Sequence, residues 1–200
     1  MVLMHEDLKK KVIIFGFEDI LVPGTVQSQV DQNSVREILS NLKELEKKFS
    51  DFHLVLVSGL QKKLFDEKIL EFGLLDYFKP ENVFNVTPEY IKTKSKDDKF
   101  VYNKNLSKDP RFKDEYFKQI IINELKIKFS CSLEEMVFVC HDVWSEAYYT
   151  CRYGKIDIAL IKSSLSKLGE QFEMQIPGLI YIDLAWTDVE KILKWQSLSN

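Results

Sequence analysis

The chain has few cysteines, and their number and spacing exclude a disulfide framework. Its 200 residues include three cysteines, Cys131, Cys140 and Cys151, and no two of them have CxxC spacing. Small disulfide-stabilised secreted domains carry cysteines in even numbers, whereas cytosolic proteins keep theirs reduced. We therefore expect buried, reduced thiols and a cytoplasmic location.

Long apolar runs and a strong excess of one charge are also absent. No apolar run approaches the roughly 18 residues that a membrane span requires. The N-terminus, MVLMHEDLKKK, lacks the apolar core of a secretory signal. The formal net charge of −3 argues against a general nucleic-acid-binding surface. These absences favour a chain with no membrane contact and no general nucleic-acid binding, and leave room for a local basic patch.

Apolar residues are plentiful, and their order predicts the fold class. The chain is 45% hydrophobic with 14 Phe and 8 Tyr, enough for one sizeable core, so we predict a single domain over residues 1–200. Short apolar strands alternate with helical patterns, which predicts a three-layer, Rossmann-like α/β fold: a parallel sheet with helices on both faces. The expected strands are 11–15, 53–57, 83–86, 135–139, 156–161 and 179–182, and the expected helices are 34–49, 62–72, 113–129, 145–153 and 188–195.

One polar segment interrupts this alternation. Residues 87–109, TPEYIKTKSKDDKFVYNKNLSKD, are rich in lysine and carry scattered aromatic residues. Long connections in compact domains are commonly functional or disordered, so the pattern predicts a long loop or lid. Its aromatic residues, Tyr90 among them, would suit a surface for a protein partner.

The most informative stretch is residues 12–22, VIIFGFEDILV. Acidic residues directly after an early strand mark the crevice of an open α/β sheet. The stretch resembles the first motif of the haloacid dehalogenase (HAD) superfamily, an apolar strand followed by DxDGTL. On that pattern Gly16 stands at the nucleophilic aspartate, Glu18 at the second aspartate, which acts as general acid/base, and Asp19 at the next position.

Two further segments resemble the second and third motifs of that family. LVLVSGL (54–60) matches the second at Ser58, and in the family this hydroxyl and the next backbone N–H, here from Gly59, hold the phosphoryl group. The third motif is a lysine that neutralises phosphate charge. Lys108 fits this position, and Lys104 remains an alternative because the surrounding segment fixes no register.

The fourth motif is matched along MVFVCHDVWSEAYYTCRYG (136–154). Here Asp142 stands at the first acid, Glu146 at the second, and Gly154 at the end of the helix, while His141 replaces the usual glycine. The resemblance implies that Asp142, with Glu146, would bind Mg²⁺, which prefers oxygen ligands. Too little chain separates the motifs for a cap domain, so we expect a capless HAD-like core.

Gly16 is the departure that bears most on function. It has no side chain, so the aspartyl-phosphate route of HAD phosphatases is closed at this position, and Mg²⁺ would bind only weakly without that carboxylate. We favour a binding or assembly module, a pseudoenzyme with a protein partner. Two alternatives stay open: an atypical Mg²⁺-dependent phosphohydrolase in which Glu18 or Asp19 activates water, assisted by Asp142 and His141, and binding of a phosphate-containing ligand or nucleotide without catalysis.

Structural roles for the same residues are also open. Ser58 could be an ordinary turn residue at the end of its strand. Asp142 could cap the following helix, since aspartate is a favoured N-cap residue.

Overall fold

The computed structural model describes residues 9–23, 30–108, 116–141, 146–147, 150, 154–160, 179–180 and 193. Six strands form one sheet in the order β3-β2-β1-β4-β5-β6, and every neighbouring pair is parallel. This is the doubly wound order, in which the chain starts at the centre and reverses direction once. The strands are β1 (Val12–Gly16), β2 (His53–Ser58), β3 (Val83–Asn85), β4 (Met136–Cys140), β5 (Asp157–Leu160) and β6 (Leu179–Ile180).

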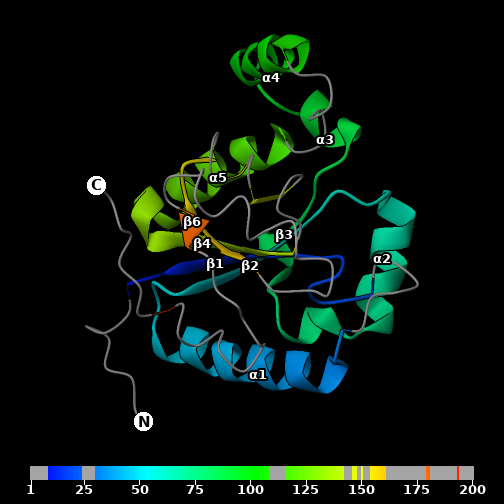
Figure 1. Cartoon of the computed structure of the whole chain (residues 1–200), viewed down its shortest axis with the longest axis vertical. Helices are drawn as coiled ribbons and strands as arrows, with labels where there is room; N and C mark the ends of the chain where they lie inside the picture. The colour runs from blue at the N-terminus through cyan, green and yellow to red at the C-terminus, as the bar shows by residue number, and fades with distance from the viewer. Residues whose placement is uncertain are drawn as a thin grey trace.

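Helices cover both faces of the sheet, so the expected three-layer fold is confirmed. Figure 1 shows α1 (Gln32–Lys48) below the sheet, α5 (Tyr116–Phe129) above it and α2 (Lys62–Glu71) beside it. In β1, Ile13 and Phe15 pack in the core on the α1 and α2 side, whereas Val12 and Ile14 pack on the α5 side. A strand buried on both faces reads as a continuous apolar run, which is why residues 12–15 show no alternation.

Short 3₁₀ turns and caps complete the connections. The turns are η2 (Leu74–Asp76), η3 (Pro80–Asn82) and η5 (Leu133–Glu135). Gly73 ends α2 in the left-handed region at φ 65°, as expected for glycine after a helix. The helix expected over 34–49 begins two residues earlier, at Gln32. Asp31 is the cap, because its carboxylate accepts the Asn33 N–H at 3.1 Å and the Ser34 hydroxyl at 2.6 Å.

The segment predicted as a loop over 87–109 is helical as far as it is described. It forms α3 (Pro88–Lys92) and α4 (Lys96–Lys108), and Figure 1 shows α4 beyond α5, away from the sheet. Lysine is a good helix former, and the prediction failed because the segment lacks an apolar stripe. Glu124 on α5 anchors α3, since it accepts a hydrogen bond from the Tyr90 hydroxyl at 2.5 Å and pairs with Lys94 at 2.5 Å. Burial and the Glu124 contact raise the pKa of Tyr90.

A buried ion pair lies where the parallel strands begin. The ammonium of Lys10, which is fully buried, bonds the carboxylate of Asp157 at the start of β5 and the carbonyl of Glu134. The helices expected at 145–153 and 188–195 lie largely outside the described residues. In the part of the chain that the structure describes, no helix combines the length and apolar character needed to cross a membrane.

Candidate functional site

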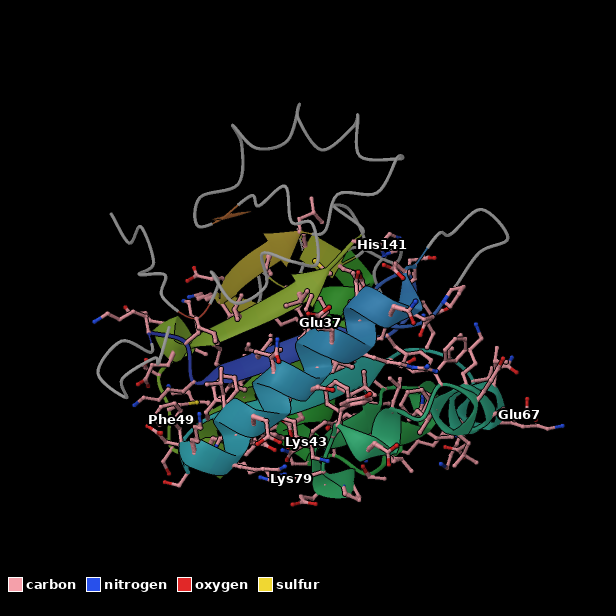
Figure 2. The ribbon with its side chains drawn as sticks, turned by 90° about the horizontal axis from the view of Figure 1, so that it is seen from below. Glu37, Lys43, Phe49, Glu67, Lys79 and His141 are labelled. Carbon is pink, nitrogen blue, oxygen red and sulfur yellow. The ribbon has the colours of Figure 1, made fainter. Side chains whose placement is uncertain are left out.

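The first and fourth motif segments meet where β1 and β4 end. These strands are neighbours at the sheet's reversal point, where the connections from their carboxyl ends diverge and open a crevice. Figure 2 shows His141 at the arrowhead end of β4, opposite the end at which Phe49 follows α1. The topology therefore brings residues 16–19 close to His141 and Glu146, although more than a hundred residues separate the two segments.

A tight turn after β1 positions the two acidic residues there. The Asp19 N–H donates to the Val22 carbonyl at 2.8 Å, and the Leu21 N–H donates to the Phe17 carbonyl at 3.0 Å. Asp19 adopts φ 58°, a left-handed conformation that aspartate tolerates better than most residues. The turn buries its apolar side chains in the core and leaves Glu18 and Asp19 partly exposed.

The space beside Gly16 is filled by a carboxylate from the fourth segment. A Cβ placed on Gly16 would lie 3.2 Å from Oε1 and 3.7 Å from Oε2 of Glu146, and 3.4 Å from the Val139 carbonyl. The His141 backbone N–H donates to Glu146 Oε2 at 3.2 Å and holds this carboxylate in place. Glu146, predicted as a metal ligand, therefore occupies the position into which the side chain of residue 16 would project.

His141 links the turn after β1 to the fourth segment. Its Nε2 lies 3.4 Å from Asp19 Oδ2 and its Nδ1 lies 3.7 Å from Glu146 Oε2. A protonated imidazole would form ion pairs with both carboxylates. The histidine at the family's usual glycine position thus contacts the acidic residues on both sides of the crevice.

Glu18 binds a proton more readily than an ordinary glutamate. Burial is the largest cause and raises the pKa of Glu18; the ammonium of Lys68 on α2 opposes this rise, and the carboxylates of Glu146 and Asp19 add to it. Lys68 is held nearby because it donates to the Pro23 carbonyl at 2.6 Å. A partly buried carboxyl group with a raised pKa suits general acid/base chemistry.

Ser58 ends β2 on the same side of the sheet, where the strands have their carboxyl ends, and is almost fully buried. Its hydroxyl oxygen accepts the Leu60 N–H at 3.1 Å, and its carbonyl accepts the Val86 N–H at 2.7 Å. These bonds favour the turn-residue interpretation of Ser58. Gly59 is exposed, with open space on the side where a Cβ would stand.

The described part of the chain does not place the remaining predicted site residues in this cluster. Asp142 lies outside the described residues. Lys108 is the last residue of α4 and Lys104 is exposed on the same helix, so the choice between them stays open. Among the residues described, no three His, Cys, Asp or Glu side chains are grouped so that they could hold a metal ion. The carboxylates of Glu18, Asp19 and Glu146 have the oxygen chemistry that Mg²⁺ prefers, and Mg²⁺ at Asp142 stays a prediction.

One contributor, Lys68, was missed at the sequence level. Lys68 lies on a helix with no motif, so no local signal identifies it. His141 was weighed as an assistant of Asp142 in the phosphohydrolase alternative, and the structure places its side chain between Asp19 and Glu146.

No family model matches the sequence, and no curated protein matches it. Solved structures of low sequence identity share its fold. A 4-nitrophenylphosphatase from Thermotoga maritima matches with a TM-score of 0.56 and 11% identity, covering 92% of this chain and 97% of that one. A HAD family hydrolase from Deinococcus radiodurans R1, with bound phosphate and sodium, matches with a TM-score of 0.55 and 9% identity over 94% and 96% of the two chains.

A protein from Listeria monocytogenes serotype 4b matches with a TM-score of 0.54 and 16% identity, over 92% of this chain and 96% of that one. The sheet order and these likenesses define a doubly wound α/β protein. More specifically, the chain has the haloacid dehalogenase-like fold, which confirms, at the level of the fold, the resemblance seen in the four motifs.

Proposed function

We propose that this chain is a HAD-like binding module that does not form an aspartyl-phosphate. One observation carries the proposal: the Glu146 carboxylate lies beside Gly16, in the space that a nucleophilic side chain at residue 16 would need. The members of a covalent catalytic unit act together, so losing the nucleophile costs many orders of magnitude in rate. The hydrogen bond from the His141 N–H gives Glu146 a structural role here.

The charge distribution supports a binding module over a phosphate site. Among the described residues, three carboxylates gather at this edge, from Glu18, Asp19 and Glu146, and the cationic groups that face Glu18 are Lys68 and His141. An anionic phosphoryl group would therefore meet a surplus of negative charge. Retained phosphate or nucleotide binding through Ser58, Gly59 and Lys108 is correspondingly disfavoured.

An atypical phosphohydrolase is the second candidate, and one observation favours it. The raised pKa of Glu18 is what a general acid/base needs near neutral pH. In this alternative Glu18 would activate water, and Asp142 would supply Mg²⁺ binding. The phosphohydrolase candidate predicts turnover that depends on Glu18 and Asp142, whereas the binding-module candidate predicts no turnover.

The test is a phosphatase assay with p-nitrophenyl phosphate and other aryl phosphates in the presence of Mg²⁺. We expect no turnover above the buffer rate from the full chain, and no heat of Mg²⁺ binding in calorimetry at millimolar concentration. Turnover that is lost in both Glu18→Gln and Asp142→Ala would overturn the binding-module proposal and establish the hydrolase. A variant far from the crevice, Lys63→Ala, is the matched control, because Lys63 is strongly exposed on α2.

A further inference from the structure

A second surface feature lies along the open edge of the sheet, away from the crevice. A groove of about 600 Å³ runs beside β3, between α2, the turns η2 and η3, and α3. None of the crevice residues lines it. Its apolar wall is formed by Phe65, Ile69, Leu70, Leu75, Pro80 and Val83.

The edge strand β3 presents the main chain of Asn85 and the carbonyl of Val83 to this groove, whereas the Val83 N–H already donates to the Pro80 carbonyl. Within the described part of the chain, β3 pairs with β2 and with no other strand. The Val86 N–H donates to the Ser58 carbonyl at 2.7 Å. Because N–H groups of a strand alternate between its two sides, the main chain of Asn85 faces away from β2. Residues 83–85 contain neither proline nor lysine, which commonly protect edge strands from pairing.

Side chains of β3 and its continuation alternate in the same way. Val83, Asn85 and Thr87 line the groove, whereas Phe84 and Val86 pack with the core on the α5 side. A further strand placed beside β3 would likewise direct every second side chain into the groove. Apolar side chains would fit there, because the leucines lining it are exposed, Leu70 by 71% and Leu75 by 46%.

The charges at the groove indicate an uncharged occupant. Lys62 pairs with Asp66 at 2.9 Å, one turn along α2, and Glu89 lies 3.7 Å from Lys92. These charges are compensated within their own helices. A bound apolar segment would therefore not separate these charged side chains from their ion-pair partners.

We propose that an extended segment of a partner protein docks in this groove as an additional strand on β3, with apolar side chains at alternate positions. Main-chain hydrogen bonds to β3 would provide affinity, and the pockets for alternate side chains would provide specificity, as in other β-augmentation complexes. The proposal deepens the binding-module function above and rests on it for the kind of ligand, a protein.

The test uses the full chain as bait for a displayed library of random linear peptides, followed by synthesis of an enriched peptide. We expect enriched peptides to carry apolar residues at alternate positions. N-methylation of the peptide amides that face β3 should weaken binding at least about tenfold, and methylation of the intervening amides should not. Leu70→Ser and Leu75→Ser should weaken binding as well. Leu64→Ser is the matched control, since Leu64 is 42% exposed on α2 and lies outside the groove.

Several outcomes would overturn the proposal. No enrichment over a bait-free selection would do so, as would equal binding of both methylated peptides or no loss of binding in Leu70→Ser. Sedimentation showing a dimer that Leu70→Ser dissociates would mean that a second copy covers the groove. The phosphatase assay is independent of all these measurements, so turnover at the crevice would overturn the function proposed there without affecting the peptide result.

Discussion

Gly16→Asp would place a carboxylate at the position where the sequence resemblance puts the HAD nucleophile, and we expect it to destabilise this protein rather than activate it. Among the described glycines, Gly73 has a positive φ and Gly16 does not. The backbone at residue 16 therefore accepts a side chain. The obstacle is the Glu146 carboxylate, 3.2 Å from the new Cβ. The substitution therefore places two carboxylates in contact.

The magnitude follows from this distance. Two unit charges about 4 Å apart repel by about 4 kcal/mol at an effective dielectric constant of 20. Glu146 retains 16% exposure of its side chain and can turn partly toward solvent, which lowers the expected loss in the free energy of unfolding to about 1–3 kcal/mol. The proximity also raises the pKa of the pair, because a like charge disfavours ionisation.

The assay is urea unfolding followed by circular dichroism at pH 7 and at pH 4. Gly16→Asn has nearly the shape of Gly16→Asp without its charge, so the difference between the two isolates the repulsion. We expect Gly16→Asp to be less stable than Gly16→Asn at pH 7. The difference should shrink at pH 4, where protonation removes the charge of one of the two carboxylates. Glu146→Gln should abolish most of the difference, and the double variant should regain stability.

Equal stability of Gly16→Asp and Gly16→Asn at pH 7 would refute this reasoning. So would a difference that Glu146→Gln leaves unchanged, because the repulsion would then have another source. Phosphatase activity in Gly16→Asp alone would show that Glu146 does not block the nucleophile position.

Three further predictions concern stability. Lys10→Met should cost about 3–5 kcal/mol by leaving the Asp157 carboxylate buried without its cation. Lys10→Met with Asp157→Leu should recover much of that loss in the same unfolding assay, and no recovery would contradict the pairing. Gly154→Ala should cost about 1–3 kcal/mol, because its Cβ would lie 2.4 Å from Ile122 Cδ1. Ile122→Val, which removes that methyl group, should reduce the penalty in a double-mutant cycle. The pKa of Glu18 is raised in the folded state above the ordinary 4.5. Ionising Glu18 therefore costs more in the folded than in the unfolded state, so its contribution to the free energy of unfolding becomes unfavourable as pH rises through the folded-state pKa. Glu18→Gln should therefore flatten the decline in unfolding free energy above pH 4.5, and an unchanged pH profile would contradict the raised pKa.

The fold was largely predictable because its signals are local. The apolar runs place β1, β2 and β4 within one residue of their observed bounds, since a strand covered on both faces must be apolar throughout. The start of α1 was placed two residues late because Asp31 and Ser34 are both good cap residues and share one hydrogen bond. The helix α3 was missed because Glu124, which anchors it, lies on a different element, and α4 was missed because its segment lacks an apolar stripe.

Three residues of the candidate cluster were indicated by the sequence, and their arrangement was not. Glu18, Asp19 and Glu146 were identified from their motif positions, and the structure brings them together. Ser58 also reaches the same sheet edge, but its hydrogen bonds are those of a turn residue. No sequence pattern shows which carboxylate lies beside Gly16, since that depends on how the fourth segment packs against β1.

By itself, the sequence determined the order of the strands and of the helices that cover the sheet, the parallel α/β class and the lack of a side chain at residue 16, because hydrophobic periodicity and residue identity are properties of single segments. Only the tertiary structure decided that Glu146 lies beside Gly16, that His141 lies between two carboxylates, and that β3, among the strands described, pairs on one side and borders an apolar groove on the other. These features join residues far apart in the chain, and contacts of that kind are fixed by packing the layers together rather than by any local preference.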